Sequence, residues 1–140
     1  MAVVIKKAVV FVDWASRGNP GPAAIGVVFQ DKKGVTLKNI SVKIGISTNN
    51  IAEYCALIFA LQEAIIMGMG ELEVFTDSEL LTKQFSGEYK VKDQTLKLLN
   101  LLVRHLRQGF KKVTVAHVPR EENRLADHEA NKALDQELFL

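Results

Sequence analysis

An apolar run that ends on a carboxylate constrains this chain most. Residues 8–13 read Ala-Val-Val-Phe-Val-Asp, and residues 14–22 follow with two glycines, two prolines and an asparagine. Such a run before a turn-rich segment is typical of a strand that leaves the core of a sheet. Asp13 can be a turn residue that bonds its own backbone. It can also be a metal ligand, because open α/β sheets bind ligands at the carboxyl ends of strands. Taken alone, this stretch favours the turn.

The composition is that of an ordinary globular protein of 140 residues, with 48% hydrophobic residues, 24% charged residues and a net charge of +2. We expect a single domain over residues 1–140. The net charge is too small to argue for a polyanionic partner. The lone Cys55 excludes an internal disulfide and a thiolate zinc site. Because no run resembles a membrane span or a signal peptide, we expect a cytoplasmic protein.

The hydrophobic periodicity predicts a mixed α/β fold. Strands over 2–13, 23–31 and 35–46, joined by short turns, predict an antiparallel meander. Strands and helices then alternate, which calls for parallel pairing through crossovers. These later elements are a helix over 51–67, a strand over 71–76, helices over 78–85 and 94–108, a strand over 111–117 and a helix over 122–134. The prediction is a mixed five-stranded sheet flanked by helices, in the order βββαβααβα.

Three further carboxylates lie at unusual places for purely structural roles. Glu53, near the start of a predicted helix, shares a stripe with apolar residues, and a carboxylate aimed at a core must be paired, protonated or metal-bound. Asp77 follows a predicted strand, and Asp127 lies in the last predicted helix. Each has an ordinary alternative: Glu53 can complement the helix dipole, Asp77 can be an N-cap and Asp127 can be a solvated surface charge.

Together with Asp13, these carboxylates predict a metal site. If the strands before Asp13 and Asp77 are parallel neighbours, both residues emerge at one rim, which Glu53 and Asp127 can reach from two helices. Clustered carboxylates repel one another unless divalent cations sit among them. All-oxygen ligands favour Mg²⁺ or Mn²⁺, and two such ions can clamp the oxygens of a phosphodiester during hydrolysis. We therefore hypothesise a nuclease site.

Four sequence blocks resemble the signatures of the type 1 ribonuclease H family, in order and spacing, from about residue 8 to residue 134. The blocks are Asp13 with the Gly-Asn-Pro-Gly-Pro of residues 18–22, residues 48–54, residues 76–78, and residues 117–123 followed by Ala126-Asp127. The resemblance implies the ribonuclease H-like fold in a short form without the basic protrusion. It also implies endonucleolytic, Mg²⁺-dependent hydrolysis of the RNA strand of RNA/DNA hybrids by two ions, leaving 5′-phosphate and 3′-hydroxyl ends. We expect Mn²⁺ to substitute for Mg²⁺.

The resemblance assigns a role to each acidic residue. The residue matching Asp13 bridges both metals, and those matching Glu53 and Asp77 complete the site on the leaving-group side. The residue matching Asp127 helps to hold the ion that activates the attacking water. His117 matches a mobile histidine that assists proton transfer or product release, the alternative being a histidine packed on the surface at a strand end.

The resemblance also implies a substrate surface that reads RNA 2′-hydroxyls in the minor groove. Its residues would be Ser16, Arg17, Gly18, Asn19, Thr48, Asn49 and Asn50, with Thr48 on a DNA-strand phosphate. Asn19 can instead be a turn residue and Thr48 an N-cap, and both roles can hold at once. In the compact loop over 87–92, Lys90 and Lys92 can contact phosphates or can simply be solvated. The expected partner is an RNA/DNA hybrid, with no obligate protein partner.

Two residues depart from the family pattern. Trp14 stands where the family usually has Gly after the first Asp, and its indole can reshape the site, reach the substrate or pack over the sheet, the last being favoured. Glu79 replaces a Gln found in many members near the RNA strand. One alternative function is a nucleic-acid-binding module with a damaged site, for which Trp14 is the only support. Another is an integrase-like nuclease or strand-transfer enzyme on the same fold.

Overall fold

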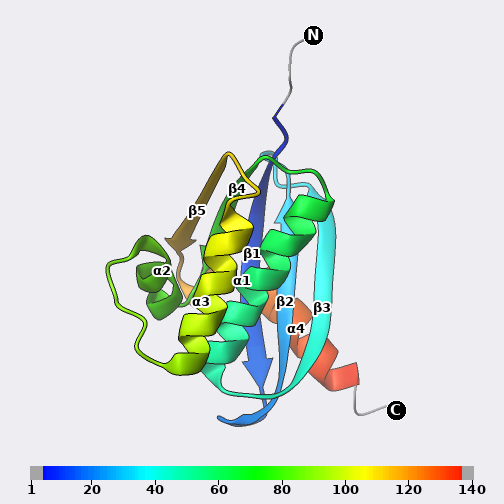
Figure 1. The fold of residues 1–140 in the computed structure, drawn as a ribbon. Helices are drawn as coiled ribbons and strands as arrows, with labels where there is room; N and C mark the ends of the chain where they lie inside the picture. The colour runs from blue at the N-terminus through cyan, green and yellow to red at the C-terminus, as the bar shows by residue number, and fades with distance from the viewer. Residues whose placement is uncertain (1–4, 137–140) are drawn as a thin grey trace.

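The structure, a computed structural model, describes residues 5–136 as a five-stranded sheet flanked by helices (Figure 1). The strands are β1 (Lys7–Ser16), β2 (Gly21–Gln30), β3 (Thr36–Ser47), β4 (Glu71–Thr76) and β5 (Lys112–His117). The helices are α1 (Asn49–Ile66), α2 (Glu79–Ser86), α3 (Gln94–Arg107) and α4 (Arg124–Asp135), with a 3₁₀ turn, η1 (Arg120–Glu122), before α4. The order βββαβααβα is the predicted one. Residues 1–4 and 137–140 lie outside the described part.

The sheet order is β3-β2-β1-β4-β5. Strand β2 pairs antiparallel with both β1 and β3, whereas β4 pairs parallel with both β1 and β5. The predicted antiparallel meander followed by parallel strands is therefore confirmed. Strand β2 is buried almost throughout, as its continuous apolar run suggests for a strand covered on both faces.

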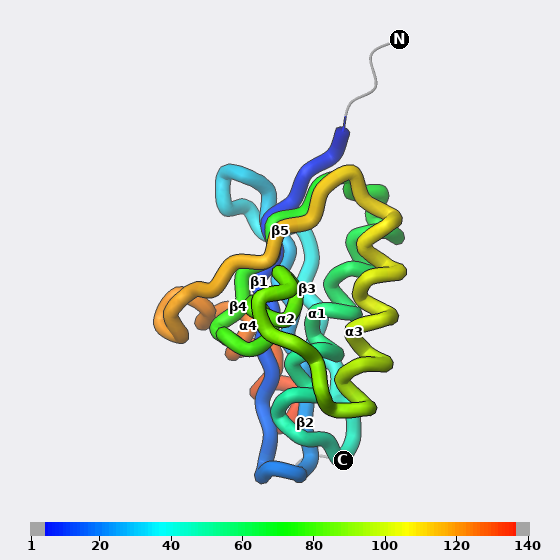
Figure 2. The backbone as a smooth tube through the Cα atoms, turned by 60° about the vertical axis from the view of Figure 1, so that its left-hand side comes forward, coloured from blue at the N-terminus to red at the C-terminus, as the bar shows by residue number. Residues whose placement is uncertain are grey.

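The helices form two layers around the sheet. Figures 1 and 2 show α1 and α3 side by side on one face, with α4 on the opposite face. Helix α1 presents a stripe of small buried side chains to the sheet, which lets its backbone approach closely; the stripe is Ala52, Ala56, Ala60 and Ala64. Among the described residues, no helix is long and apolar enough to cross a lipid bilayer.

A glycine allows the close contact between α4 and β2. A Cβ atom at Gly26 would lie 2.0 Å from the carbonyl oxygen of Ala126 and 2.6 Å from the backbone nitrogen of Ala130. Any side chain there would push against the backbone of α4, which cannot rotate away as a side chain can. Gly26 therefore sets the depth at which α4, and with it Asp127, lies on the sheet.

The boundaries of β1 differ from the prediction. The strand begins at Lys7 and runs past Asp13 to Ser16, and residues 2–4 of the predicted strand lie outside the described residues. β1 stays paired with β2 as far as Ser16, although its parallel pairing with β4 stops at Phe11. Asp13 is therefore an internal strand residue, and the prediction that the strand ends there is wrong. The local turn signal missed this because the partner strand, not the following loop, determines where β1 ends.

Two helix starts correct the sequence interpretation. Thr48 caps α1 by accepting a hydrogen bond from the backbone N–H of Ile51 at 3.3 Å, so α1 begins at Asn49 and Glu53 lies in its second turn. Ser78 caps α2 by accepting from the N–H of Leu81 at 3.1 Å. The N-cap alternative for Thr48 is therefore confirmed, whereas that for Asp77 is wrong.

The glycine contact predicts a large stability loss for Gly26→Ala. We expect the free energy of unfolding to fall by about 3 kcal/mol or more, because the new methyl group collides with helix backbone rather than with a movable side chain. Denaturant unfolding measures this change. The matched control is Gly109→Ala, whose Cβ would meet mainly the flexible end of Ile65 at 3.0 Å. We expect that variant to stay within about 1 kcal/mol of the unchanged protein. Equal losses in the two variants would contradict the backbone explanation.

Candidate active site

The site forms where β1 and β4 part. Their last paired residues are Phe11 and Phe75, whose rings stack 5.4 Å apart. Asp13 and Asp77 each lie two residues beyond that pair. The two carboxylates therefore start from neighbouring positions at the carboxyl-end rim of the parallel strands, as the sequence predicts.

All four predicted carboxylates line one open hollow of about 590 Å³ at this rim. Asp13 comes from β1, Glu53 from α1, Asp77 from the segment after β4, and Asp127 from α4. The hollow is completed by Trp14, Ala15, Ser16, Gly18, Asn19, Asn49, Arg120 and Asn131. Carboxylates separated by as many as 114 positions in the sequence thus share one cleft.

The carboxylates reach the rim from both faces of the sheet. Along β1, Val10 and Val12 pack in the core beneath α1, whereas Ala15 packs against α4. Because side chains alternate along a strand, Asp13 belongs to the α4 face and Trp14 to the α1 face. Asp127 approaches on the first of these faces and Glu53 on the second.

Helix α4 is fixed to β1 next to the site. The side-chain amide of buried Asn123 donates a hydrogen bond to the carbonyl oxygen of Val12 at 2.8 Å. The backbone N–H of Asp127 donates to the carbonyl oxygen of Asn123, and the amide of Asn131 donates to Asp127 Oδ1 at 3.2 Å. These bonds anchor the first turn of α4 beside β1, and Asp127, which is half-buried, lines the hollow.

Glu53 accepts a hydrogen bond at each of its carboxylate oxygens. The indole N–H of Trp14 donates to Oε1 at 3.0 Å, and the hydroxyl of Ser78 donates to Oε2 at 2.7 Å. Burial raises the pKa of Glu53, the bonds from Ser78 and Trp14 lower it, and the charge of Asp77 raises it further. The prediction that Trp14 merely packs over the end of the sheet is wrong, because its indole reaches into the site.

Asp13 is the most strongly perturbed carboxyl group in the hollow. It is only 6% exposed, and burial followed by the charge of Asp77 raises its pKa from 3.8 to about 7. The backbone N–H of Trp14, which donates to Asp13 Oδ1 at 2.8 Å, and the charge of Arg120 act in the opposite direction. Burial also raises the pKa of Asp77, and the charge of Asp127 raises that pKa further. The site therefore concentrates mutually repelling negative charge.

The donor set suits a hard divalent cation. Four carboxylates face one hollow, and oxygen ligands are those that Mg²⁺ and Mn²⁺ prefer. Within residues 5–136, no three His, Cys, Asp or Glu side chains are grouped closely enough to form a finished metal centre as they stand. The structure thus brings the expected ligands to one cleft, with Glu53 held by Trp14 and Ser78.

Six of the nine predicted substrate residues line the carboxylate hollow or a hollow that adjoins it. Ser16, Gly18, Asn19 and Asn49 line the same hollow, and an adjoining hollow of about 620 Å³ is lined in part by Asn19, Thr48, Asn49 and Asn50. Asn19 Oδ1 accepts from the backbone N–H of Asn49 at 3.1 Å, which joins the first loop to the start of α1. Arg17 instead pairs with Asp135 at 2.5 Å.

The remaining predicted residues lie apart from the hollow. His117 is exposed at the end of β5, beside Thr76 of β4. Lys90 and Lys92 are exposed in the loop between α2 and α3, where Lys90 lines a separate hollow with Tyr89 and Arg104.

Sequence reasoning missed two contributions. Arg120, in η1, lines the hollow, and its charge lowers the pKa values of both Asp13 and Asp77. A cation soon after a strand that ends near an acidic rim is the signal that could have found it. Asn123 lies in the sequence block 117–123, which assigns it no role, and only the contact with Val12 shows that it anchors α4.

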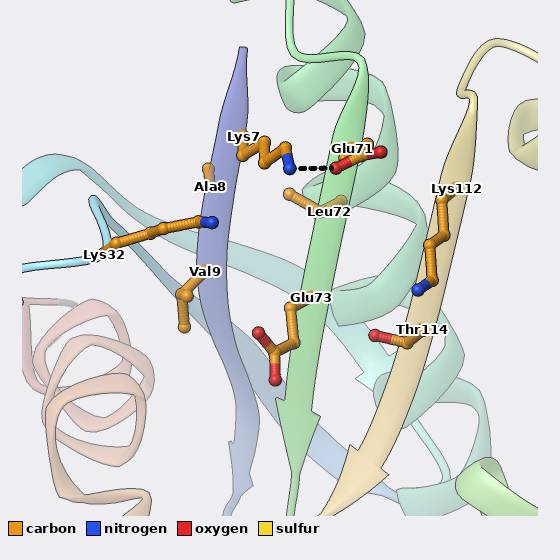
Figure 3. Close-up of a pocket in the computed structure, with 9 residues that line it drawn as sticks. All are labelled: Lys7, Ala8, Val9, Lys32, Glu71, Leu72, Glu73, Lys112 and Thr114. Carbon is orange, nitrogen blue, oxygen red and sulfur yellow. Dashed lines mark ion pairs between the residues drawn. The ribbon is translucent and has the colours of Figure 1, made fainter. Parts of the chain in front are cut away.

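A second hollow, of about 300 Å³, opens at the opposite ends of the strands. Figure 3 shows Lys7 paired with Glu71 across β1 and β4 at 3.1 Å, with Lys32 extending toward β1. Its charged lining residues are Lys7, Lys32, Glu71, Glu73 and Lys112. Because both signs are mixed and two of these residues already pair, this hollow has no comparable cluster of like charge.

Known proteins of similar sequence give a consistent assignment. The family described as reverse transcriptase-like matches residues 11–133. A ribonuclease HI of Halobacterium salinarum is 43% identical over 125 residues, which make up 89% of this chain and 63% of that protein. The bifunctional protein Rv2228c of Mycobacterium tuberculosis is 41% identical over 130 residues, or 92% of this chain and 36% of that protein. The chain thus spans less than two thirds of the length of these curated relatives.

Solved structures agree with the sequence comparison. The RNase H1 of Halobacterium salinarum matches with a TM-score of 0.90 at 42% identity, covering 93% of this chain and 98% of that one. LC11-RNase H1, solved in complex with an RNA/DNA hybrid, matches with a TM-score of 0.89 at 43% identity, covering 94% of this chain and 99% of that one. The matches in sequence and structure extend over nearly the whole chain, which therefore belongs to the type 1 ribonuclease H family.

Proposed function

We propose that this chain hydrolyses the RNA strand of RNA/DNA hybrids with two divalent metal ions, leaving 5′-phosphate and 3′-hydroxyl ends. The observation that carries the proposal is the convergence of Asp13, Glu53, Asp77 and Asp127 on one hollow. A similar protein, LC11-RNase H1, has been solved with an RNA/DNA hybrid, which supports the substrate class.

The four carboxylates are the groups that would hold the ions. Mg²⁺ bound there would neutralise charge on the phosphodiester and lower the pKa of a water for in-line attack. Asp13, which lines the hollow with the other three carboxylates, would be a ligand shared by the ions if both are bound. By the family resemblance, Glu53 and Asp77 would hold the ion on the leaving-group side, and Asp127 would help to hold the ion that activates the attacking water. Mn²⁺, with similar ligand preferences, is expected to substitute.

Recognition of the RNA strand is assigned to the polar wall of the hollow. Ser16, Asn19 and Asn49 line it next to the carboxylates. An asparagine amide can both donate and accept a hydrogen bond, which suits a 2′-hydroxyl that does the same. Thr48 and Asn50 extend this wall into the adjoining hollow, where a DNA-strand phosphate could bind.

Two cationic or titratable side chains at the rim have further roles in the proposal. Arg120 lines the hollow and attracts a phosphate while it moderates repulsion among the carboxylates. His117, exposed at the end of β5 and close enough to Asp77 for its charge to lower the pKa of that carboxyl group, is assigned to proton transfer or release of the cleaved strand.

A nucleic-acid-binding module with a damaged site is the competing function. Its support is Trp14, but the indole donates to Glu53 and leaves that carboxylate on the hollow. A module that only binds phosphates gains nothing from four carboxylates facing them. The hydrolytic function therefore accounts for more of the site.

Removal of Asp13 tests the proposal directly. We expect the unchanged protein with Mg²⁺ to cut the RNA of a labelled RNA/DNA duplex and to leave RNA/RNA and DNA/DNA duplexes intact. Asp13→Asn should lower the rate by roughly a thousandfold or more, because a lost ion ligand removes several kcal/mol of transition-state stabilisation. Glu73→Gln, an exposed carboxylate on β4 away from the hollow, is the matched control and should keep full activity. Hybrid binding without cleavage in either Mg²⁺ or Mn²⁺ would support the binding module instead.

The loop lysines give a prediction about salt dependence. If Lys90 and Lys92 contact two phosphates, the Lys90→Ala/Lys92→Ala variant should bind the hybrid with a log–log salt slope that is smaller by about 1–2. Fluorescence anisotropy at several salt concentrations measures it. The matched control, Lys32→Ala/Lys112→Ala, changes two exposed lysines at the opposite ends of the strands and should leave the slope as it was. An unchanged slope for the loop variant rejects the contact.

The raised pKa of Asp13 predicts that stability depends on pH in the metal-free protein. Burial and the charge of Asp77 raise the pKa of its carboxyl group in the folded protein from the ordinary value of 3.8 to about 7. Between these values the folded protein retains a proton that the unfolded chain has lost, so the free energy of unfolding should fall as pH rises. Above pH 7 the full loss, on the order of a few kcal/mol, is present. Mg²⁺ should offset it by binding the folded state.

Urea unfolding in chelator at several pH values between 4 and 8 measures this effect. We expect Asp13→Asn to flatten the dependence, to be more stable than the unchanged protein at pH 8 and to gain less from added Mg²⁺. Glu73→Gln again serves as the control. If both variants follow the pH profile of the unchanged protein, Asp13 is not the responsible group.

A further inference from the structure

Residue 14 contacts two of the four carboxylates at once. Its backbone N–H donates to Asp13 Oδ1 at 2.8 Å, and its indole N–H donates to Glu53 Oε1 at 3.0 Å. The other oxygen of Glu53 accepts from the hydroxyl of Ser78. Ser78 is itself fixed, because the same hydroxyl accepts the capping bond from Leu81. The carboxylate of Glu53 is therefore held on one side by the strand residue Trp14 and on the other by Ser78, the N-cap of α2.

These two hydrogen bonds leave Glu53 able to bind an ion. An ionised carboxylate has about four lone-pair positions, and two are used by the bonds to Trp14 and Ser78. The bonds fix the rotation of a side chain that could otherwise adopt several rotamers, while Glu53 still lines the hollow. Partners of this kind, which orient a ligand without touching the ion, commonly affect metal affinity by 10–100-fold.

We propose that Trp14 is a positioning residue for Glu53, and that its indole N–H sets the affinity of the rim for divalent cations. The inference rests on the proposed ion site, but not on the identity of the nucleic acid that is cut. A glycine at this position has no side-chain donor. In this chain, hydrogen bonds from both Ser78 and Trp14 orient the carboxylate of Glu53.

The chain provides its own reporter, because Trp14 is its single tryptophan. Indole emission responds to the loss or change of a hydrogen-bonded charge nearby. Titration of the unchanged, metal-free protein with Mg²⁺ alone should therefore shift the emission with a saturable midpoint. Glu53→Ala, which removes the acceptor of the indole bond, should alter the emission before any metal is added.

Two substitutions separate the N–H group from the bulk of the ring. Trp14→Phe keeps an aromatic ring but has no donor, and Trp14→Leu removes the ring as well. We expect both to weaken Mg²⁺ binding by about tenfold, measured by calorimetry and by the shift in unfolding temperature with Mg²⁺. Cleavage by Trp14→Phe should recover at high Mg²⁺, because the ligands themselves remain.

Tyr54→Phe is the matched control on the same helix. It removes the hydroxyl that donates to Gln84 at 2.6 Å in the core, so it should lower the unfolding temperature without changing the Mg²⁺ midpoint. A Trp14→Phe midpoint within twofold of the unchanged protein overturns the proposal. If only Trp14→Leu changes, and it weakens hybrid binding rather than Mg²⁺ binding, the ring contacts substrate instead. Absence of hybrid cleavage together with a normal Mg²⁺ titration would defeat the proposed function but not this inference.

Discussion

The burial of like charges at one edge of the sheet is the constraint on which the rest of the structure depends. Asp13 is nearly covered, and its pKa reaches about 7 because water is excluded and because Asp77 and Asp127 are close. In the absence of cations, this arrangement costs folding free energy. The backbone bond from Trp14 and the charge of Arg120 reduce that cost but do not remove it. Such a cluster is what a cation-binding function requires and what packing alone would not produce.

The position of the cluster follows from how the sheet divides. The parallel strands β1 and β4 separate after Phe11 and Phe75, while β1 continues along β2 to Ser16. The separation opens the hollow, and the continued pairing with β2 holds the backbone of Asp13 in the sheet. Gly26, opposite Asp13 on β2, lets α4 lie close enough to bring Asp127 to the same place.

Much of the fold and of the candidate site was predictable from the sequence, and the predictions that failed did so for physical reasons. Hydrophobic periodicity predicted the elements and the sheet type. The expected parallel pairing of the strands before Asp13 and Asp77 brought the four carboxylates to one rim, and the family resemblance then assigned a role to each. The end of β1 was predicted wrongly because the local turn signal says nothing of pairing with β2. The bond from Trp14 to Glu53 joins residues 39 positions apart, so no local pattern could specify it. Arg120 was missed because its role is electrostatic and depends on the fold of η1 against the rim.

Three consecutive residues of β1 connect these observations. The carbonyl of Val12 holds Asn123 and thereby α4, Asp13 supplies the central carboxylate, and Trp14 holds Glu53 on α1. Because side chains alternate along a strand, those of Asp13 and Trp14 leave in opposite directions from one short, sheet-paired stretch. A shift of β1 by one residue would exchange the faces and separate all three contacts. The geometry of the site therefore depends on the register of β1. Pairing with β2 maintains this register on one side of the hollow, beyond the point where β4 has separated from β1 on the other side.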